Sequence, residues 1–229
     1  MGLDKTLQLP VKNKESIIRF IIGGLLDIVP IANLLSSGYA FLLMRRQILE
    51  KPPEEIPEWD NWGTLFKYGI FTFLISLGYS IIPIAIFGLG IAAMYPQIAL
   101  LKFIGVTLVV LGGVCFLAAF FFLPMGLILF AIEDEFSSAF AFLRVIDMTI
   151  KHIGPYFKAF IILLVIGIVL GLISNIPLIG WIVGVFVGFY LLLETALLMG
   201  AVGREMLAVE TGGARVVATE ETFDTEVPS

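Results

Sequence analysis

The residue most capable of chemistry is Glu194, a carboxylate at the end of a long uncharged stretch of the sequence. Residues 159–193 contain no charged side chain, and Glu194 follows them about ten residues, or roughly 15 Å of helix, before Arg204. An ionised carboxylate inside a bilayer costs on the order of 2.5–3.5 kcal/mol on insertion scales, so Glu194 must be protonated, hydrated or paired. One explanation is structural: a pair with Arg19, or a protonated acid hydrogen-bonded to a tyrosine. The other is an ion or substrate site, a polar site within the membrane to which Glu194, Arg19 and Tyr39 would belong.

No other set of residues has the types and spacing of a reactive centre. The only histidine is His152 and the only cysteine is Cys115, which argues against a zinc site and excludes an intramolecular disulfide. No phosphate-binding glycine loop, nucleophile elbow or triad pattern occurs. We therefore predict no catalytic residue, no metal and no cofactor, and a protein that is not an enzyme. The net charge of −5 argues against a nucleic-acid partner.

The composition is that of a membrane protein with several crossings. Of 229 residues, 59% are hydrophobic and 14% are charged, against roughly 45–50% and 25% in soluble domains. The mean hydropathy is +1.02. Several charge-free runs exceed the roughly 20 residues that a spanning helix needs. The sequence thus predicts an all-α, polytopic helical bundle whose surroundings are the lipid bilayer.

The apolar runs and their breaks predict six membrane segments between a polar cytoplasmic arm at residues 1–15 and an acidic, disordered tail at residues 205–229. The first two segments are short, because Pro30 separates them. If Pro30 only kinks one long helix, the chain has five segments instead. The six predicted segments cover residues 16–29, 31–47, 64–82, 100–132, 156–173 and 178–204.

The basic residues favour six segments. With six, thirteen of the fourteen Lys and Arg residues lie on the side that carries both termini, and only Lys102 lies on the other; with five, the split is nine against five. Loops rich in Lys and Arg remain in the cytoplasm. We therefore expect a multi-pass protein of the cell membrane with cytoplasmic N- and C-termini.

The connections between segments carry features of a membrane surface. Trp59 and Trp62 precede the third segment and are expected at the level of the lipid headgroups. That segment is expected to stop at Pro83, and residues 84–97 to form an irregular connection. Pro124 is expected to kink the long fourth segment near its cytoplasmic end.

Residues 136–152 predict an amphipathic helix that lies in the interface plane. Arg144, Asp147 and Lys151 share its polar face, and Gly154-Pro155 is expected to end it. Its apolar positions recur at spacings of three and four: Phe136, Phe140, Leu143, Ile146 and Ile150.

Small residues four apart predict close packing of the last two segments, which a turn at residues 174–177 joins. Glycines at this spacing form a groove that lets two helices approach closely in lipid. The two stripes are Gly167 with Gly171, and Gly180 with Gly184 and Gly188.

Three stretches share a pattern with a known family: Pro30 through Gly38-Tyr39 to Arg45-Arg46, Pro57 to Phe66 with Gly69, and Phe136-Ser137-Ser138-Ala139-Phe140. The most specific is Trp59-Asp60-Asn61-Trp62-Gly63-Thr64-Leu65-Phe66. Over about residues 17–204 the chain resembles prokaryotic integral membrane proteins catalogued as domain of unknown function 4013. The resemblance implies a helical membrane protein without an assigned activity, so it supplies no catalytic residue.

Two functions from different classes remain open at this point. The absence of a reactive constellation favours an accessory or assembly component of the membrane, which acts through a membrane-protein partner or a homo-oligomer. The alternative is a small-molecule or ion transporter or channel that uses Glu194.

Overall fold

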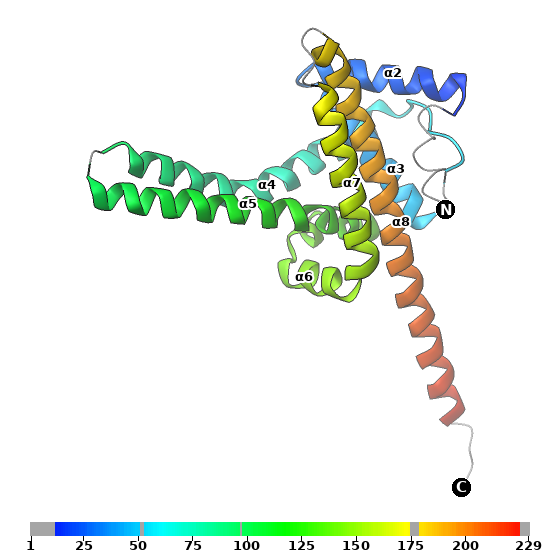
Figure 1. The fold of residues 1–229 in the computed structure, drawn as a ribbon. Helices are drawn as coiled ribbons and strands as arrows, with labels where there is room; N and C mark the ends of the chain where they lie inside the picture. The colour runs from blue at the N-terminus through cyan, green and yellow to red at the C-terminus, as the bar shows by residue number, and fades with distance from the viewer. Residues whose placement is uncertain (1–11, 51–52, 97, 175–178, 225–229) are drawn as a thin grey trace.

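The described part of the chain is built from α-helices and contains no strand. The computed structural model describes residues 12–50, 53–96, 98–174 and 179–224. The fold class is therefore all-α, as predicted. In chain order the elements are α2 (Lys14–Ile28), α3 (Asn33–Leu49), α4 (Trp62–Met94), α5 (Ala99–Glu133), the 3₁₀ helix η2 (Phe136–Phe140), α6 (Phe142–Lys151), α7 (Ile153–Ser174) and α8 (Ile179–Asp224) (Figure 1).

Within the described residues, four helices are long and apolar enough to cross a membrane: α4, α5, α7 over Ile153–Leu172 and α8 over Gly184–Gly212. A helix suits this environment because it satisfies its own backbone hydrogen bonds where no water is present. The helices α2 and α3 are shorter, with 15 and 17 residues. Six crossings therefore remain a prediction, and four are supported by length and composition.

The chain turns between α2 and α3 at residues 29–32, so Pro30 lies in a turn and not inside one kinked helix. The Asn33 nitrogen donates to the Val29 carbonyl oxygen at 3.0 Å across this turn. The Ser36 hydroxyl then donates to the Gly23 carbonyl oxygen at 3.2 Å and joins the two helices. Figure 1 shows α2 running across α7 and α8 rather than along them.

The α4–α5 hairpin corrects the prediction for residues 84–97. The helix α4 continues through Pro83, so the expected stop and the irregular connection are wrong. The glycines in this stretch are packing positions. A Cβ at Gly90 would lie 2.7 Å from the backbone nitrogen of Val109, and one at Gly112 would lie 2.8 Å from a backbone nitrogen of α4. Close packing in lipid keeps this glycine-containing sequence helical.

The predicted helix at residues 136–152 is two elements, η2 and α6, so a single continuous helix is wrong. Ala141 separates them with φ −73° and ψ 67°. The Tyr79 hydroxyl donates to the Ala139 carbonyl oxygen at 2.7 Å, and this group would otherwise accept a bond within a continuous helix. Leu143, one of the predicted apolar positions, is 88% exposed. The side chain that α6 buries against the protein is Val145, which is 1% exposed.

The start of α7 also differs from the prediction. Gly154 and Pro155 lie in its first turn instead of ending the preceding helix, which already ends at Lys151. Proline is tolerated there, because the backbone N–H groups of the first turn have no acceptor within the helix, so the N–H that proline lacks costs no hydrogen bond.

The last helix is longer than predicted. The disordered tail expected at residues 205–229 is wrong as far as Asp224, because α8 continues to that residue. Residues 205–224 contain three Ala and four Glu, which are good helix formers, and no proline. The predicted turn at residues 174–177 falls on residues 175–178, which lie outside the described part.

The core lies where α3 crosses α4 and packs along α8. Buried side chains from α3, among them Tyr39 and Leu43, meet Leu193 and Leu197 of α8. The α3–α4 crossing requires glycine on both helices. A Cβ at Gly38 would lie 1.8 Å from the Leu65 carbonyl oxygen, and one at Gly69 would lie 1.8 Å from the Leu34 carbonyl oxygen. The two backbones are therefore in direct contact.

Candidate functional site

The candidate site is the buried carboxylate of Glu194 on α8. Its side chain is fully buried, in the same part of α8 as Phe189 and Leu193, and α8 packs against α2 and α3. Within the described chain, neither carboxylate oxygen accepts a hydrogen bond of ordinary geometry. Tyr190, one turn earlier, is near enough to interact with the carboxylate, although outside that geometry. The carboxylate thus has no strong partner among the described residues.

Arg19 is not the partner of Glu194, which corrects the predicted pair. Its Nη1 donates to the Ile56 carbonyl oxygen at 2.6 Å, and its Nη2 lies 2.9 Å from Glu58 Oε1. The Glu58 side chain is 78% exposed, so this pair forms without burying two charges. No local pattern in the sequence indicates that the irregular segment after α3 returns to α2 and engages Arg19.

That segment, Pro53–Asn61, is held against α2, and we call it the 53–61 segment. The Lys12 Nζ donates to the Glu54 carbonyl oxygen at 2.8 Å, and Asn13 Nδ2 donates to Glu55 Oε1 at 2.6 Å. The Ile56 side chain is 1% exposed. The 53–61 segment is therefore a fixed part of the structure despite its prolines and acids.

Tyr39 and Trp59 join the 53–61 segment to α3. Their rings stack at 4.2 Å with an interplanar angle of 14°. The Tyr39 hydroxyl donates to the Pro57 carbonyl oxygen at 2.5 Å, and the Trp59 indole nitrogen donates to the Arg19 carbonyl oxygen at 2.9 Å. Tyr39 therefore serves the packing of this segment and, like Arg19, is not placed on the Glu194 carboxylate.

Trp62 differs from Trp59 although the two rings lie 6.0 Å apart. It begins α4 and its side chain is 47% exposed, as a position at the membrane surface would be. Asn61 precedes it with φ 50°, in the left-handed region that asparagine tolerates. It occupies the N-cap position without a side-chain hydrogen bond.

An ion-pair cluster that the sequence did not suggest ties three helices together. Arg45 Nη1 donates to Asp134 Oδ1 and, at 2.9 Å, to the Tyr68 hydroxyl, and that hydroxyl donates to Asp134 Oδ1 at 2.8 Å. The Arg45 guanidinium and the Tyr68 hydroxyl hold the pKa of the Asp134 carboxyl below its usual value. Arg45 and Asp134 are 89 residues apart, so no local pattern indicates the contact.

Asp134→Asn is expected to lower the free energy of unfolding at neutral pH, and the deficit should shrink on acidification. A carboxyl whose pKa is lowered by folding stabilises the protein above its unfolded pKa of about 3.9, and this contribution is lost as the pH falls through the folded pKa. Asn tolerates the φ of 57° at this position, so the variant tests charge rather than backbone strain. Thermal unfolding at pH 7 and in acid, wild type against variant, measures the effect. A deficit that does not depend on pH would contradict it.

The charges predicted on the polar face of α6 are used within the protein. Arg144 pairs with Glu133 at the end of α5. Lys151 lies 2.7 Å from Asp147, one turn earlier, and this carboxylate raises the pKa of the Lys151 ammonium group. Arg144 thus helps to hold α6 against α5, and the Asp147–Lys151 pair remains on the exposed surface.

Three glycines of the stripes on α7 and α8 have space beside them for a side chain. A Cβ at Gly167, Gly171 or Gly188 would meet no described atom within 4 Å. Gly184 and Gly188 instead line an open groove of about 390 Å³ beside Asp27, Asn33 and Ser37. Close packing of the last two helices through these stripes therefore stays a prediction.

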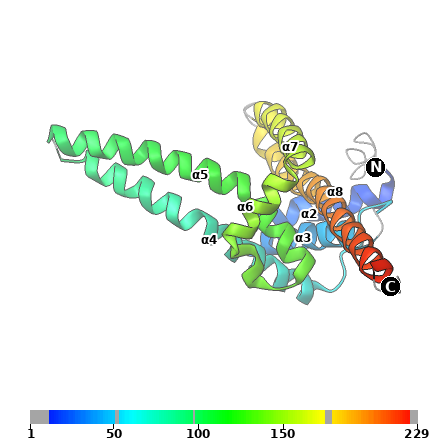
Figure 2. The same ribbon diagram turned by 90° about the horizontal axis from the view of Figure 1, so that it is seen from below.

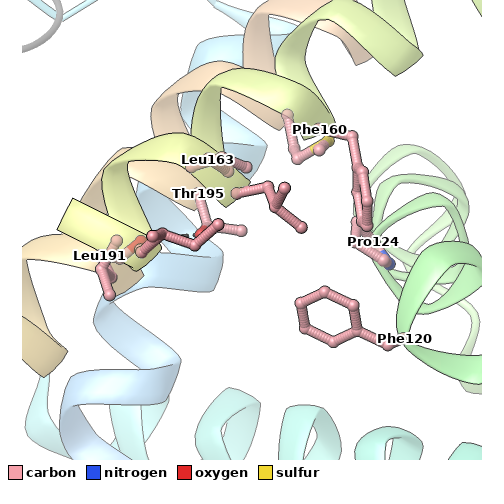
Figure 3. A pocket seen from close by; sticks show the side chains of 10 residues that line it. Phe120, Pro124, Phe160, Leu163, Leu191 and Thr195 are labelled. Atoms are coloured by element: carbon pink, nitrogen blue, oxygen red, sulfur yellow. Dashed lines mark hydrogen bonds between the residues drawn. The ribbon is translucent and has the colours of Figure 1, made fainter. Parts of the chain in front are cut away.

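An apolar cleft of about 420 Å³ lies between α5, α7 and α8 (Figure 3). The Thr195 hydroxyl in its wall donates to the Leu191 carbonyl oxygen at 2.7 Å. The cleft therefore suits hydrocarbon and not a polar substrate. Figure 3 shows Phe120 and Pro124 facing residues of the other two helices, Phe160, Leu163, Leu191 and Thr195. As for metals, the described residues contain no group of three His, Cys, Asp or Glu side chains that could hold an ion.

Residues 21–179 identify the family to which the chain belongs. They match the family model described as protein of unknown function (DUF4013), which thus covers the chain from the middle of α2 to the start of α8. The chain belongs to this family. The DUF4013 region contains the 53–61 segment, the Arg45–Asp134 cluster and the α4–α5 hairpin, whereas Glu194 lies beyond its end. No curated protein and no solved structure matches the chain.

Proposed function

We propose that this DUF4013 protein is an accessory or assembly component of the cell membrane, without enzymatic activity, that binds a helix of another membrane protein through the α4–α5 hairpin. The distribution of basic residues supports an orientation with both termini in the cytoplasm. The observation that carries the proposal is an apolar groove on the hairpin.

The hairpin itself reaches away from the remaining helices. Figures 1 and 2 show this in both views, with α4 and α5 in contact with other elements only near one end. Large apolar side chains are exposed on both helices, for example Leu89 at 64% and Leu117 at 68%. Lipid alone would accept such side chains, so exposure by itself does not indicate a partner.

The groove gives the hairpin a shaped surface. Its volume is about 620 Å³, and glycines from both helices are among the residues that line it. Gly90 and Gly112 face the partner helix within the hairpin, whereas a Cβ at Gly88 or Gly113 would meet no described atom within 4 Å. Outward glycines let the backbone of another helix approach closely in lipid. The groove is lined by Pro83, Ile84, Phe87, Gly88, Gly112, Gly113, Phe116 and Leu117.

Gly113→Leu is expected to remove partner binding and leave the fold unchanged. The new side chain fills the groove, and we expect at least about a tenfold loss of the copurifying protein, equivalent to about 1.4 kcal/mol of binding free energy. The measurement is extraction of the tagged protein from its own membrane in mild detergent, with quantitative mass spectrometry of what remains bound.

Gly112→Leu is the matched control at the neighbouring position. Its side chain would meet the backbone of Phe87, where even a Cβ would lie 2.8 Å from the nitrogen, so this variant should lose folded protein. If Gly113→Leu folds normally and keeps every bound protein of the wild type, the groove is not the binding surface. Recovery of the wild type alone, without a bound protein, contradicts the accessory function itself.

Glu194 favours a second candidate function, transport of an ion or small molecule. Ionisable side chains within membrane helices mark ion and substrate pathways in many transporters. Proton flux into proteoliposomes, followed with an internal pH-sensitive dye, should fall in Glu194→Gln if this function holds. Equal flux in the wild type, the variant and empty liposomes would remove it.

A further inference from the structure

The arginines whose side chains are described on α2, α3 and α8 are already engaged elsewhere. Arg19 is bound to the 53–61 segment, and Arg45 is bound to Asp134. Arg46 lies 3.7 Å from Glu50, and Arg204 Nη1 donates to the Glu50 carbonyl oxygen at 2.6 Å. None of these four guanidinium groups, all in the described part of the chain, forms an ion pair with Glu194. A positive counter-charge for this carboxylate is therefore absent from the described residues.

The remaining titratable groups on the elements packed against α8 do not change this result. The Tyr39 hydroxyl bonds Pro57, and the Tyr156 hydroxyl donates to the Phe121 carbonyl oxygen. On α5, Glu133 pairs with Arg144. The others lie near helix ends or on exposed surface: Lys14, Glu15 and Asp27 on α2, Lys102 on α5, Lys158 on α7, Glu205 and Glu210 on α8, and Glu54, Glu55, Glu58 and Asp60 in the 53–61 segment.

We propose that Glu194 is a proton-binding site, which the folded protein holds as a neutral carboxylic acid at neutral pH. Three observations carry this: the side chain is fully buried, no counter-charge from the described residues pairs with it, and neither oxygen accepts a hydrogen bond of ordinary geometry from those residues. An isolated carboxylate is strongly disfavoured under these conditions, whereas a neutral acid is tolerated. The acid O–H is also a donor that the ionised form lacks, and Tyr190 offers a hydroxyl oxygen one turn away.

Infrared spectroscopy tests the protonation state directly. The full-length protein in lipid nanodiscs at pH 7 should show the carbonyl stretch of a protonated carboxyl, shifted in D₂O. The band should disappear in Glu194→Gln, which has nearly the same shape. Asp27→Asn is the matched control, because Asp27 is a half-buried acid near the end of α2, and the band should persist there. Loss of the band in Asp27→Asn, or its persistence in Glu194→Gln, would overturn the proposal.

Two further measurements, a pH titration of the wild type and an exchange of choline chloride for NaCl, complete the test. If Glu194→Gln fails to fold, the wild type alone is titrated, and the band should remain above about pH 6, where carboxyls of ordinary pKa near 4 are ionised. A wild type without the band there overturns the proposal. Adding NaCl in place of choline chloride should leave the band unchanged, and its loss would show a sodium site instead. The inference holds whether or not the protein transports, so equal flux in the transport test leaves it standing.

Discussion

Gly69→Ala is expected to prevent normal folding. The new Cβ would lie 1.8 Å from the carbonyl oxygen of Leu34 and 2.7 Å from its carbonyl carbon, and backbone atoms of α3 cannot rotate away as a flexible side chain can. Overpacking in a core typically costs about 1–3 kcal/mol, and we expect at least the upper end because two helices must separate. Gly38→Ala should behave alike, since Gly38 faces the Leu65 carbonyl oxygen at the same crossing.

The measurement is thermal unfolding of the purified protein in detergent, together with its elution profile in gel filtration. Gly63→Ala is the control on the same helix, because a Cβ at Gly63 meets no described atom within 4 Å. It should leave the free energy of unfolding within about 0.5 kcal/mol of the wild type. A Gly69→Ala protein as stable as the wild type would show that α3 and α4 do not cross in this way.

Trp59→Ala is the second large effect that we expect. The substitution removes the stacking on Tyr39, the contact with Phe189 and the hydrogen bond from the indole nitrogen to the Arg19 carbonyl oxygen. Truncating a core tryptophan costs about 3–5 kcal/mol, and the half-buried position of Trp59 reduces this to about 2–3 kcal/mol. The 53–61 segment should detach first, so limited proteolysis within it should become faster, together with a lower unfolding temperature.

Trp62→Ala provides the comparison, because it is the same substitution three positions later in the chain. The Trp62 side chain is 47% exposed, so its loss should change the free energy of unfolding much less than that of Trp59. Both variants should be compared in the same detergent, since each removes one indole ring. Equal losses of stability would contradict the different roles assigned to the two tryptophans.

The number and type of the helices could be predicted largely from the sequence, because apolar runs in a membrane protein have few alternatives to helix. The distribution of the basic residues favours the turn at Pro30. The break at Ala141 could not be foreseen, because it depends on the Tyr79 hydroxyl reaching the Ala139 carbonyl oxygen 60 residues away.

The errors share a physical cause: one sequence does not show which helix a residue faces. Gly90 looks like a helix breaker until Val109 is placed against it. Arg19 looks like the partner of Glu194 until the 53–61 segment, 37 residues away at Ile56, occupies its guanidinium. The burial of Glu194 was predictable from hydropathy, whereas the absence of a counter-charge followed only from the positions of the arginines.

The pairing of α2 and α3 affects how the nascent chain is inserted into the bilayer. The turn at residues 29–32 joins α2, which runs across α8, to α3, which packs along α8. If both helices cross the membrane, as the six-segment prediction has it, the chain returns to its starting side before α4, and thirteen of the fourteen basic residues lie on that side. The first pair would then leave the direction of α4 and of every later segment unchanged. We therefore expect that the pair can insert after the later helices have fixed the orientation.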